Sequence, residues 1–231
     1  MKFEEDMTED DLIKKVLNLK RNPDGSISTL TIAIRGARQL SGRNTDTGEI
    51  IPKIDLENFK KQTLGGTYES NKFMSVAMYL IIIDLIGNIF KRKGGKEQKN
   101  QRFKQALEHF SELNSNQIDS LKALRNSLAH KFSLGNESEI FTLDFSKESE
   151  DIIVPPEERY VSKNRNNKSK DENVSTAYYE NICDLVENIY GELHNSSKKN
   201  QLEIVAKYKE NIKLKIHDFN SMYFVNNNAD K

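Results

Sequence analysis

The chain has 231 residues, 36% of them hydrophobic, and its 35 Lys and Arg residues balance 35 Asp and Glu residues. This length fits one sizeable domain with a small appendage. The formal net charge of zero excludes a protein that coats nucleic acid through bulk positive charge, although a local basic patch is compatible with it. The single cysteine, Cys183, excludes an intrachain disulfide and a cysteine-based metal site. The acidic N-terminus lacks an apolar signal region, which predicts a cytoplasmic protein.

Residues 1–66 are expected to form an N-terminal extension that packs on the main domain. Apolar residues within 12–17 have the spacing of one helix face, and a turn signal, Asn-Pro-Asp-Gly, occupies 22–25. Apolar residues alternate with small or polar ones over 30–34, which predicts a half-buried strand.

Residues 67–220 are expected to form a helical domain. Its most apolar segment, 73–90, has nearly the length of a membrane span, but Asp84 lies within it, and a charge there is costly in a bilayer. The segment is therefore expected to be a helix enclosed by other helices. Apolar periodicity predicts further helices over 97–113, 117–132, 174–194 and 201–216.

The apolar period changes to alternation after the third of these helices. Alternating residues at 141–145 and a short apolar run before two prolines predict a small β-hairpin, or two short strands, inserted over about 136–156. The polar segment 157–173 is expected to be a flexible loop, and 221–231 a tail. Four basic side chains of the loop fit either a solvated surface or a weak contact with RNA: Lys163, Arg165, Lys168 and Lys170.

The helix predicted over 117–132 carries the sequence Arg-Asn-Ser-Leu-Ala-His at 125–130. At about 100° per residue its leucines gather on one face, Asn126 and His130 point away from that face together, and Arg125 lies on the boundary. An imidazole can transfer a proton near neutral pH, and a guanidinium can hold a phosphate oxygen and stabilise charge that develops on it. These groups suit RNA cleavage by the 2′-hydroxyl, without a metal or cofactor. The same spacing also fits a surface ion pair and a histidine favoured by the helix dipole.

In-line cleavage of RNA needs both a base and an acid, and one motif supplies a single histidine. Two copies of the helix that meet across a twofold axis would supply two histidines and two arginines. Asp84 is a further candidate, because a carboxylate in an apolar helix should be paired. Its partner is expected to be Arg125 or His130; the alternative is a local hydrogen bond to another helix, or a position on the edge of the bundle.

An arginine followed by a polar residue, with a histidine after four intervening residues near a helix end, resembles the signature of the HEPN superfamily. The segment LRNSLAHKF at 124–132 carries it, and the order of helices from about 70 to 215 resembles that of the family. The resemblance implies an all-α bundle that dimerises through the motif helices. It also implies that Arg125 and His130 are catalytic, with Asn126 as the adjacent polar residue. Many members of the family are metal-independent endoribonucleases of toxin–antitoxin, phage-defence and RNA-processing systems.

The predicted fold is mainly α, a HEPN-like helical bundle with a small β-hairpin insertion and a short N-terminal strand-containing region. The predicted function is cleavage of single-stranded or looped RNA by a homodimer, with an antitoxin protein as a possible partner and no role for a membrane. Two alternatives stay open: a non-catalytic HEPN-like binding or dimerisation module, which the neutral charge favours, and a helical scaffold in which the motif is coincidental. Motifs of zinc proteases, P-loop NTPases and GxSxG hydrolases are absent from the sequence.

Overall fold

The computed structural model describes most of the chain: residues 7–51, 68–96, 98, 101–131, 133–135, 139–146, 149–155, 174–205 and 222–226. The protein is mainly α. Its helices are α1 (Glu9–Leu17), α2 (Thr29–Ser41), α4 (Tyr68–Ile89), α5 (Arg102–Phe110), α6 (Ser115–Lys131) and α7 (Tyr179–Lys198). Its strands are short: β1 (Ser26–Ser28), β2 (Phe90–Arg92), β3 (Ile140–Asp144), β4 (Ile153–Val154), β5 (Val174–Tyr178), β6 (Leu202–Ile204) and β7 (Phe224–Asn226).

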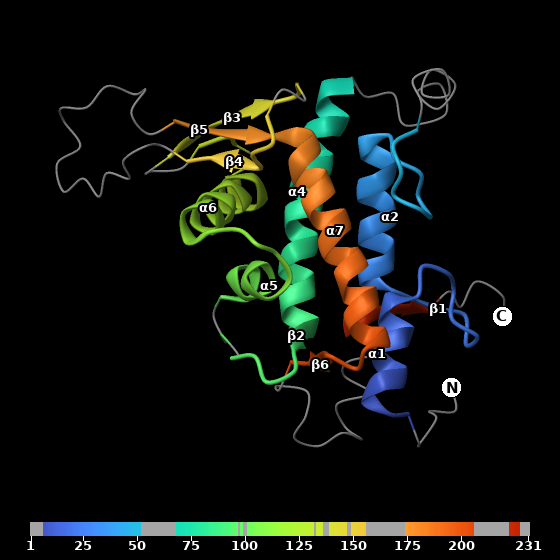
Figure 1. The fold of residues 1–231 in the computed structure, drawn as a ribbon. Coiled ribbons are helices and arrows are strands. Elements are labelled where there is room, and N and C mark those ends of the chain that lie inside the picture. Colours follow the sequence, from blue (N-terminus) through green and yellow to red (C-terminus); the bar gives the residue numbers. More distant parts are fainter. Residues whose placement is uncertain are drawn as a thin grey trace.

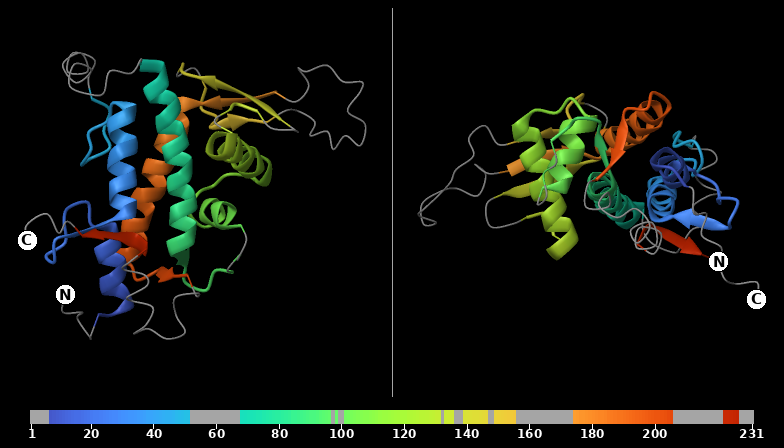
Figure 2. Two further views of the ribbon diagram at one scale, coloured as in Figure 1. Left: turned by 180° about the vertical axis from the view of Figure 1, so that it is seen from behind. Right: turned by 90° about the horizontal axis from the view of Figure 1, so that it is seen from below.

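Three long helices, α2, α4 and α7, run side by side and form the body of the fold (Figure 1). Helices α5 and α6 pack on one side of α4, and their axes run across it (Figure 2). The small sheet of β3, β4 and β5 lies beside α6, at one end of this pair (Figure 1). The α5–α6 pair and the sheet thus form one flank of the molecule, and the N-terminal helices form the other.

Helix α4 is the centre of the hydrophobic core. Residues on several of its faces are fully buried, among them Val76, Tyr79, Ile82 and Ile86. Its residues 71–89 are long and apolar enough to cross a membrane, yet 61% of that window is buried inside the protein. Burial of this kind is typical of the core helix of a soluble protein.

Gly87 explains how closely α5 crosses α4. A Cβ atom at this position would overlap the backbone carbonyl oxygen of Arg102, in the first turn of α5. Any side chain at 87 would therefore push α5 away from α4. The glycine sets the depth at which α5 lies, and α6 packs directly against α5.

The strand predicted over 30–34 is wrong, because this segment is the first turns of α2. Ser28 is the N-cap, and its side chain accepts a hydrogen bond from the Thr31 backbone nitrogen at 3.0 Å. Leu30 and Ile34 are fully buried, whereas Ile32 between them is 43% exposed. A strand would place all three on one face, but residues i and i+4 share a helix face that excludes i+2. The region does contain a strand, β1, which pairs antiparallel with β7.

Of the two alternatives over 136–156, the two short strands are present as β3 and β4, whereas the hairpin is wrong because these strands do not pair with each other. Strand β5 lies between them, parallel to β3 and antiparallel to β4. This strand was predicted as the start of the helix over 174–194, but α7 begins only at Tyr179. Within β5, Ser175 and Ala177 are buried and their neighbours are half-buried, which is the alternation of a strand.

The helix predicted over 201–216 begins instead as strand β6, which pairs antiparallel with β2. Leu202 and Ile204 are buried and Glu203 between them is not, so the local period is two. The rest of that predicted helix, the loop over 157–173 and the end of the tail after 226 lie outside the described residues.

Candidate active site on helix α6

Helix α6 begins at a reciprocal cap that fixes the register of the motif. The Gln117 backbone nitrogen donates to Asn114 Oδ1 at 3.0 Å, and the Asn114 backbone nitrogen donates to Gln117 Oε1 at 3.2 Å. Two otherwise orphaned N–H groups of the helix start are satisfied in this way. Asn114 is therefore the N-cap of α6.

The predicted apolar face of α6 is confirmed. Ile118, Leu121, Leu124 and Leu128 are each at most 2% exposed. They face the core formed with α4 and α5. Burial of these side chains fixes the rotation of α6, and with it the direction of the motif residues.

Asp84 of α4 and Arg125 of α6 form an ion pair, with side chains 19% and 23% exposed. A second guanidinium nitrogen, Arg125 Nη1, donates to Asn126 Oδ1 at 2.9 Å. The structure thus brings Asp84, Arg125 and Asn126 together and identifies Arg125 as the partner of the carboxylate. The third nitrogen, Arg125 Nε, is buried and makes no hydrogen bond.

The charge of Arg125 survives this environment. Burial lowers the pKa of the guanidinium. Because an arginine keeps its proton under all ordinary conditions, the pair is a true ion pair. Two of the five N–H groups are used, and a further hydrogen on each Nη remains for another acceptor.

His130 is exposed and lies apart from this cluster. Among the described residues none is hydrogen-bonded to its imidazole. Five helical positions separate it from Arg125, which turns the two side chains about 140° apart around the helix axis. One chain therefore presents the guanidinium against α4 and the imidazole to solvent, and does not join them in one site.

The four predicted RNA-contacting residues lie outside the described residues: Lys163, Arg165, Lys168 and Lys170. Another basic segment is described, at the turn after α4, where Lys93 and Lys96 are exposed. Lys91 and Arg92 in the adjoining strand β2 pair with Glu203 and Glu192, at 2.9 Å and 3.0 Å. Residues 91–96 are called the basic turn.

Sequence reasoning missed a buried polar cluster between α2, α7 and the loop over 42–51. Arg38, 3% exposed, binds both carboxylate oxygens of Glu187 and donates to the backbone carbonyls of Thr45 and Asp46, each at 3.0 Å. The hydroxyl of Tyr79 donates to the same carboxylate at 3.0 Å. Burial raises the pKa of Tyr79, so this hydroxyl stays protonated.

Arg43 completes the cluster at the next turn of α7. Its Nη2 contacts Asp184 at 2.6 Å and Glu180 at 3.3 Å, and its Nη1 donates to the Gly48 carbonyl at 3.3 Å. Burial raises the pKa of the neighbouring Cys183, which makes that thiol unreactive. The two arginines hold the loop against α7, and Nε of Arg43 is buried without a hydrogen-bond partner.

Comparison with protein-family models, with curated proteins and with solved structures finds no match for this chain. Among the described residues, no three His, Cys, Asp or Glu side chains are grouped so that they could hold a metal ion.

Proposed function

We propose that the protein is a metal-independent endoribonuclease of HEPN type that cleaves single-stranded or looped RNA as a homodimer. The observation that carries the proposal is the arrangement on α6. A guanidinium is oriented by Asp84 and Asn126, and an imidazole on the same helix is exposed to solvent. The resemblance of 124–132 to the HEPN signature supports the same reaction.

In the proposed reaction, His130 accepts the proton of the RNA 2′-hydroxyl. The 2′-oxygen attacks the adjacent phosphorus, the bond from phosphorus to the 5′-oxygen breaks, and a 2′,3′-cyclic phosphate forms. His130 of the partner subunit donates a proton to the departing 5′-oxygen. Arg125 binds a non-bridging oxygen and stabilises the charge that grows on it. Asp84 and Asn126 are positioning residues, because they act through Arg125.

Within one chain the side chains of Arg125 and His130 point in different directions, and a dimer through α6 would bring them into one site. Two α6 helices related by a twofold axis bring each His130 toward the motif of the other copy. Flexible RNA is the preferred substrate, because its 2′-oxygen can reach the in-line position, whereas a duplex resists that geometry. The setting that fits such an enzyme is a cytoplasmic toxin–antitoxin or phage-defence system, with an antitoxin protein as partner.

Incubation of the purified protein with a mixed RNA pool in EDTA tests this proposal. We expect products with cyclic phosphate ends, and loss of cleavage in Arg125→Ala and His130→Ala. Arg35→Ala is the matched control, because Arg35 forms an exposed ion pair with Asp46 on another face. Absence of cleavage by the wild-type protein, or equal cleavage by all four proteins, would contradict the proposal.

A second candidate is a non-catalytic HEPN-like binding or dimerisation module. It is favoured by the Asp84–Arg125 pair, which partly neutralises the cation that would bind phosphate. Stable dimers that bind RNA or a protein partner, but leave RNA intact over hours, would distinguish this function from the first.

A further inference from the structure

A cleft of about 450 Å³ lies between the end of α5, strand β2 and one face of α7. Small-molecule sites typically have volumes of roughly 300–1,000 Å³, with an apolar lining and a few polar groups. The floor here is formed by Phe110, Leu185 and Ile189, each at most 7% exposed. The cleft is therefore large enough for one heterocyclic base and has an apolar surface for it to rest on.

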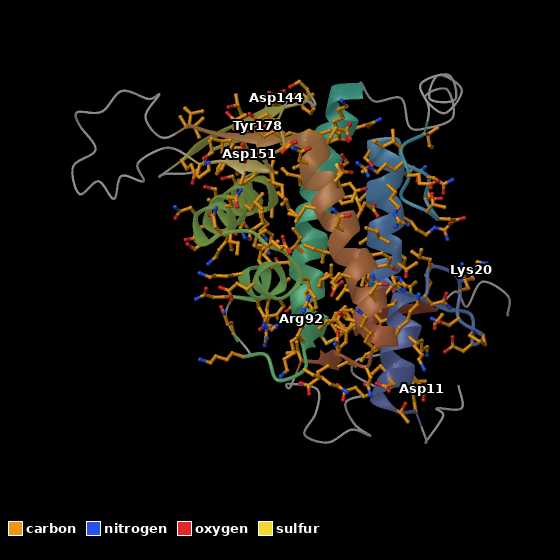
Figure 3. The ribbon with its side chains drawn as sticks, in the orientation of Figure 1. Asp11, Lys20, Arg92, Asp144, Asp151 and Tyr178 are labelled. Carbon is orange, nitrogen blue, oxygen red and sulfur yellow. The ribbon has the colours of Figure 1, made fainter. Side chains whose placement is uncertain are left out.

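Arg92 covers the aromatic part of this floor. In Figure 3 it lies below α5, where β2 and α7 meet. Its guanidinium carbon is 5.8 Å from the centroid of the Phe110 ring, and its Nη2 is 3.0 Å from Glu192 Oε1. The Arg92 side chain is 49% exposed, so it can swing outward at little cost. A planar ligand can then lie between the ring and the guanidinium.

The polar rim of the cleft carries two carboxylates and an amide beside Arg92 and Ser111. Glu192 and Glu112 offer carboxylates, and Asn188 offers one amide. Ser196 donates to Glu192 Oε1 at 3.0 Å, which holds this carboxylate in place. A carboxylate with two parallel oxygens is matched best by a ligand edge that carries two adjacent N–H donors.

Guanine is the RNA base with such an edge, since its N1–H and its 2-amino group lie side by side. Adenine and cytosine each carry one amino donor beside a ring acceptor that the carboxylate would repel, and uracil carries one N–H between two carbonyl groups. Proteins that read single-stranded RNA commonly stack an unpaired base on an aromatic ring or a guanidinium plane and bind its Watson–Crick edge.

We propose that this cleft binds an unstacked guanine of the RNA strand, and that it sets the sequence preference of the enzyme; the inference rests on the proposed ribonuclease function. The base stacks on Phe110 beneath Arg92, and its N1–H and amino group bind Glu192. Exposed Lys93 and Lys96 of the basic turn attract the flanking phosphates. The cleft adjoins Glu112, three residues before α6 begins, and Arg125 lies about 15 Å further along that helix.

Calorimetric titration with the four nucleoside 5′-monophosphates tests the site without any cleavage. GMP is expected to bind at least tenfold more tightly than AMP, CMP or UMP. Glu192→Gln is expected to weaken GMP binding about tenfold, because the amide replaces one acceptor by a donor. Phe110→Leu removes the stacking surface and is expected to weaken it by a similar factor. Circular dichroism of each variant checks that the fold is retained.

Glu203→Gln is the matched control, because Glu203 pairs with Lys91 on the neighbouring β2–β6 ladder, and it does not line the cleft. Its affinity for GMP should equal that of the wild type. Equal binding of all four nucleotides, no binding, or unchanged GMP affinity in Glu192→Gln would overturn the base site.

The two proposals fail in different ways. Arg125→Ala is expected to bind GMP normally, since Arg125 is not part of the cleft. GMP binding without any RNA cleavage would overturn the ribonuclease and leave the base site. Cleavage at all four bases with equal frequency would overturn the base site and leave the ribonuclease.

Discussion

The pairs Arg38–Glu187 and Arg125–Asp84 each link two helices of this protein, and they differ in how many guanidinium N–H groups have no hydrogen-bond partner. Every side-chain nitrogen of Arg38 is hydrogen-bonded, to Glu187 or to loop carbonyls, and the residue is 3% exposed. Arg125 is 23% exposed, contacts Asp84 and Asn126, and keeps a buried Nε without a partner. The first guanidinium is fully committed to the fold, whereas the second retains donors for another acceptor.

The number of guanidinium N–H groups without a partner is a physical criterion that distinguishes a structural arginine from one that is available to bind a ligand. Buried polar groups are almost always satisfied, so an arginine with no spare donor serves the fold. An orphaned donor next to a partly exposed ion pair is a cost that a bound anion can relieve. This criterion sets Arg125 apart from Arg38, although Nε of Arg43 in the buried cluster also has no hydrogen-bond partner. Arg125 is the candidate for phosphate binding because it lies on the same helix as the exposed His130.

The largest expected effect is a loss of stability on replacement of Arg38. Arg38→Ala removes a buried cation and leaves the half-buried Glu187 carboxylate without it, and is expected to destabilise the fold by about 3–5 kcal/mol. Arg125→Ala removes a partly exposed pair and should cost about 1 kcal/mol or less. Urea unfolding followed by circular dichroism measures both values. Equal losses in the two variants would remove the distinction between the pairs.

The next largest effect is expected from a substitution that displaces α5 and, with it, the motif helix α6. Gly87→Ala places a methyl group against the Arg102 carbonyl and is expected to cost about 1–3 kcal/mol as α5 and α6 shift. Gly191→Ala is the matched control, because a Cβ on this exposed helical glycine meets nothing within 4 Å. It should stabilise α7 by up to about 1 kcal/mol. Thermal unfolding of both variants gives the comparison, and a neutral Gly87→Ala would show that α5 is not held at this depth.

A smaller effect is expected from replacing the guanidinium of the Asp84–Arg125 pair by an amine. Arg125→Lys keeps the positive charge, but a lysine cannot contact Asp84 and a phosphate through one planar fork. RNA cleavage is expected to fall at least about tenfold while the free energy of unfolding changes by less than about 1 kcal/mol. Single-turnover cleavage of a defined RNA measures the first quantity. Full activity in this variant would mean that charge alone suffices and that Asp84 does not position Arg125.

The sequence predicted those parts of the molecule whose pattern is local. The buried faces of α6 and α7 follow from helical periodicity, and the enclosure of α4 follows from its apolar composition; all three helices lie close to their expected positions. The pairing of Asp84 was foreseen as one of two alternatives, because a carboxylate in an apolar helix requires a partner. Its identity depended on how α6 rotates against α4, which no single segment encodes.

The failures come from contacts between distant segments. The alternation over 30–34 is too short to tell a strand from a helix with one exposed isoleucine, and the Ser28 cap decides in favour of the helix. The hairpin was wrong because the partner of β3 begins at Val174, more than twenty residues after β3 ends. Arg38 and Glu187 are 149 positions apart, and the cleft is lined by residues of three separate elements. No local sequence pattern predicts either the ion pair or the cleft.

The smallest expected effect is at a third ion pair, between Lys15 and Asp24 at 2.7 Å, on the surface of the molecule. Burial opposes ionisation of Asp24, but hydrogen bonds from Lys15 and Ser26 outweigh it and lower its pKa to about 2. A carboxyl group with a depressed pKa stabilises the fold at neutral pH, and this contribution disappears as the pH falls from about 4 through 2. Solvent screening limits it to about 1 kcal/mol. Wild type and Asp24→Asn should therefore differ slightly in stability at pH 6 and converge near pH 2. A constant difference across that range would show that Asp24 acts through its hydrogen bonds to the turn rather than through its charge, and would leave Arg38 and Arg125 as the two ends of the comparison.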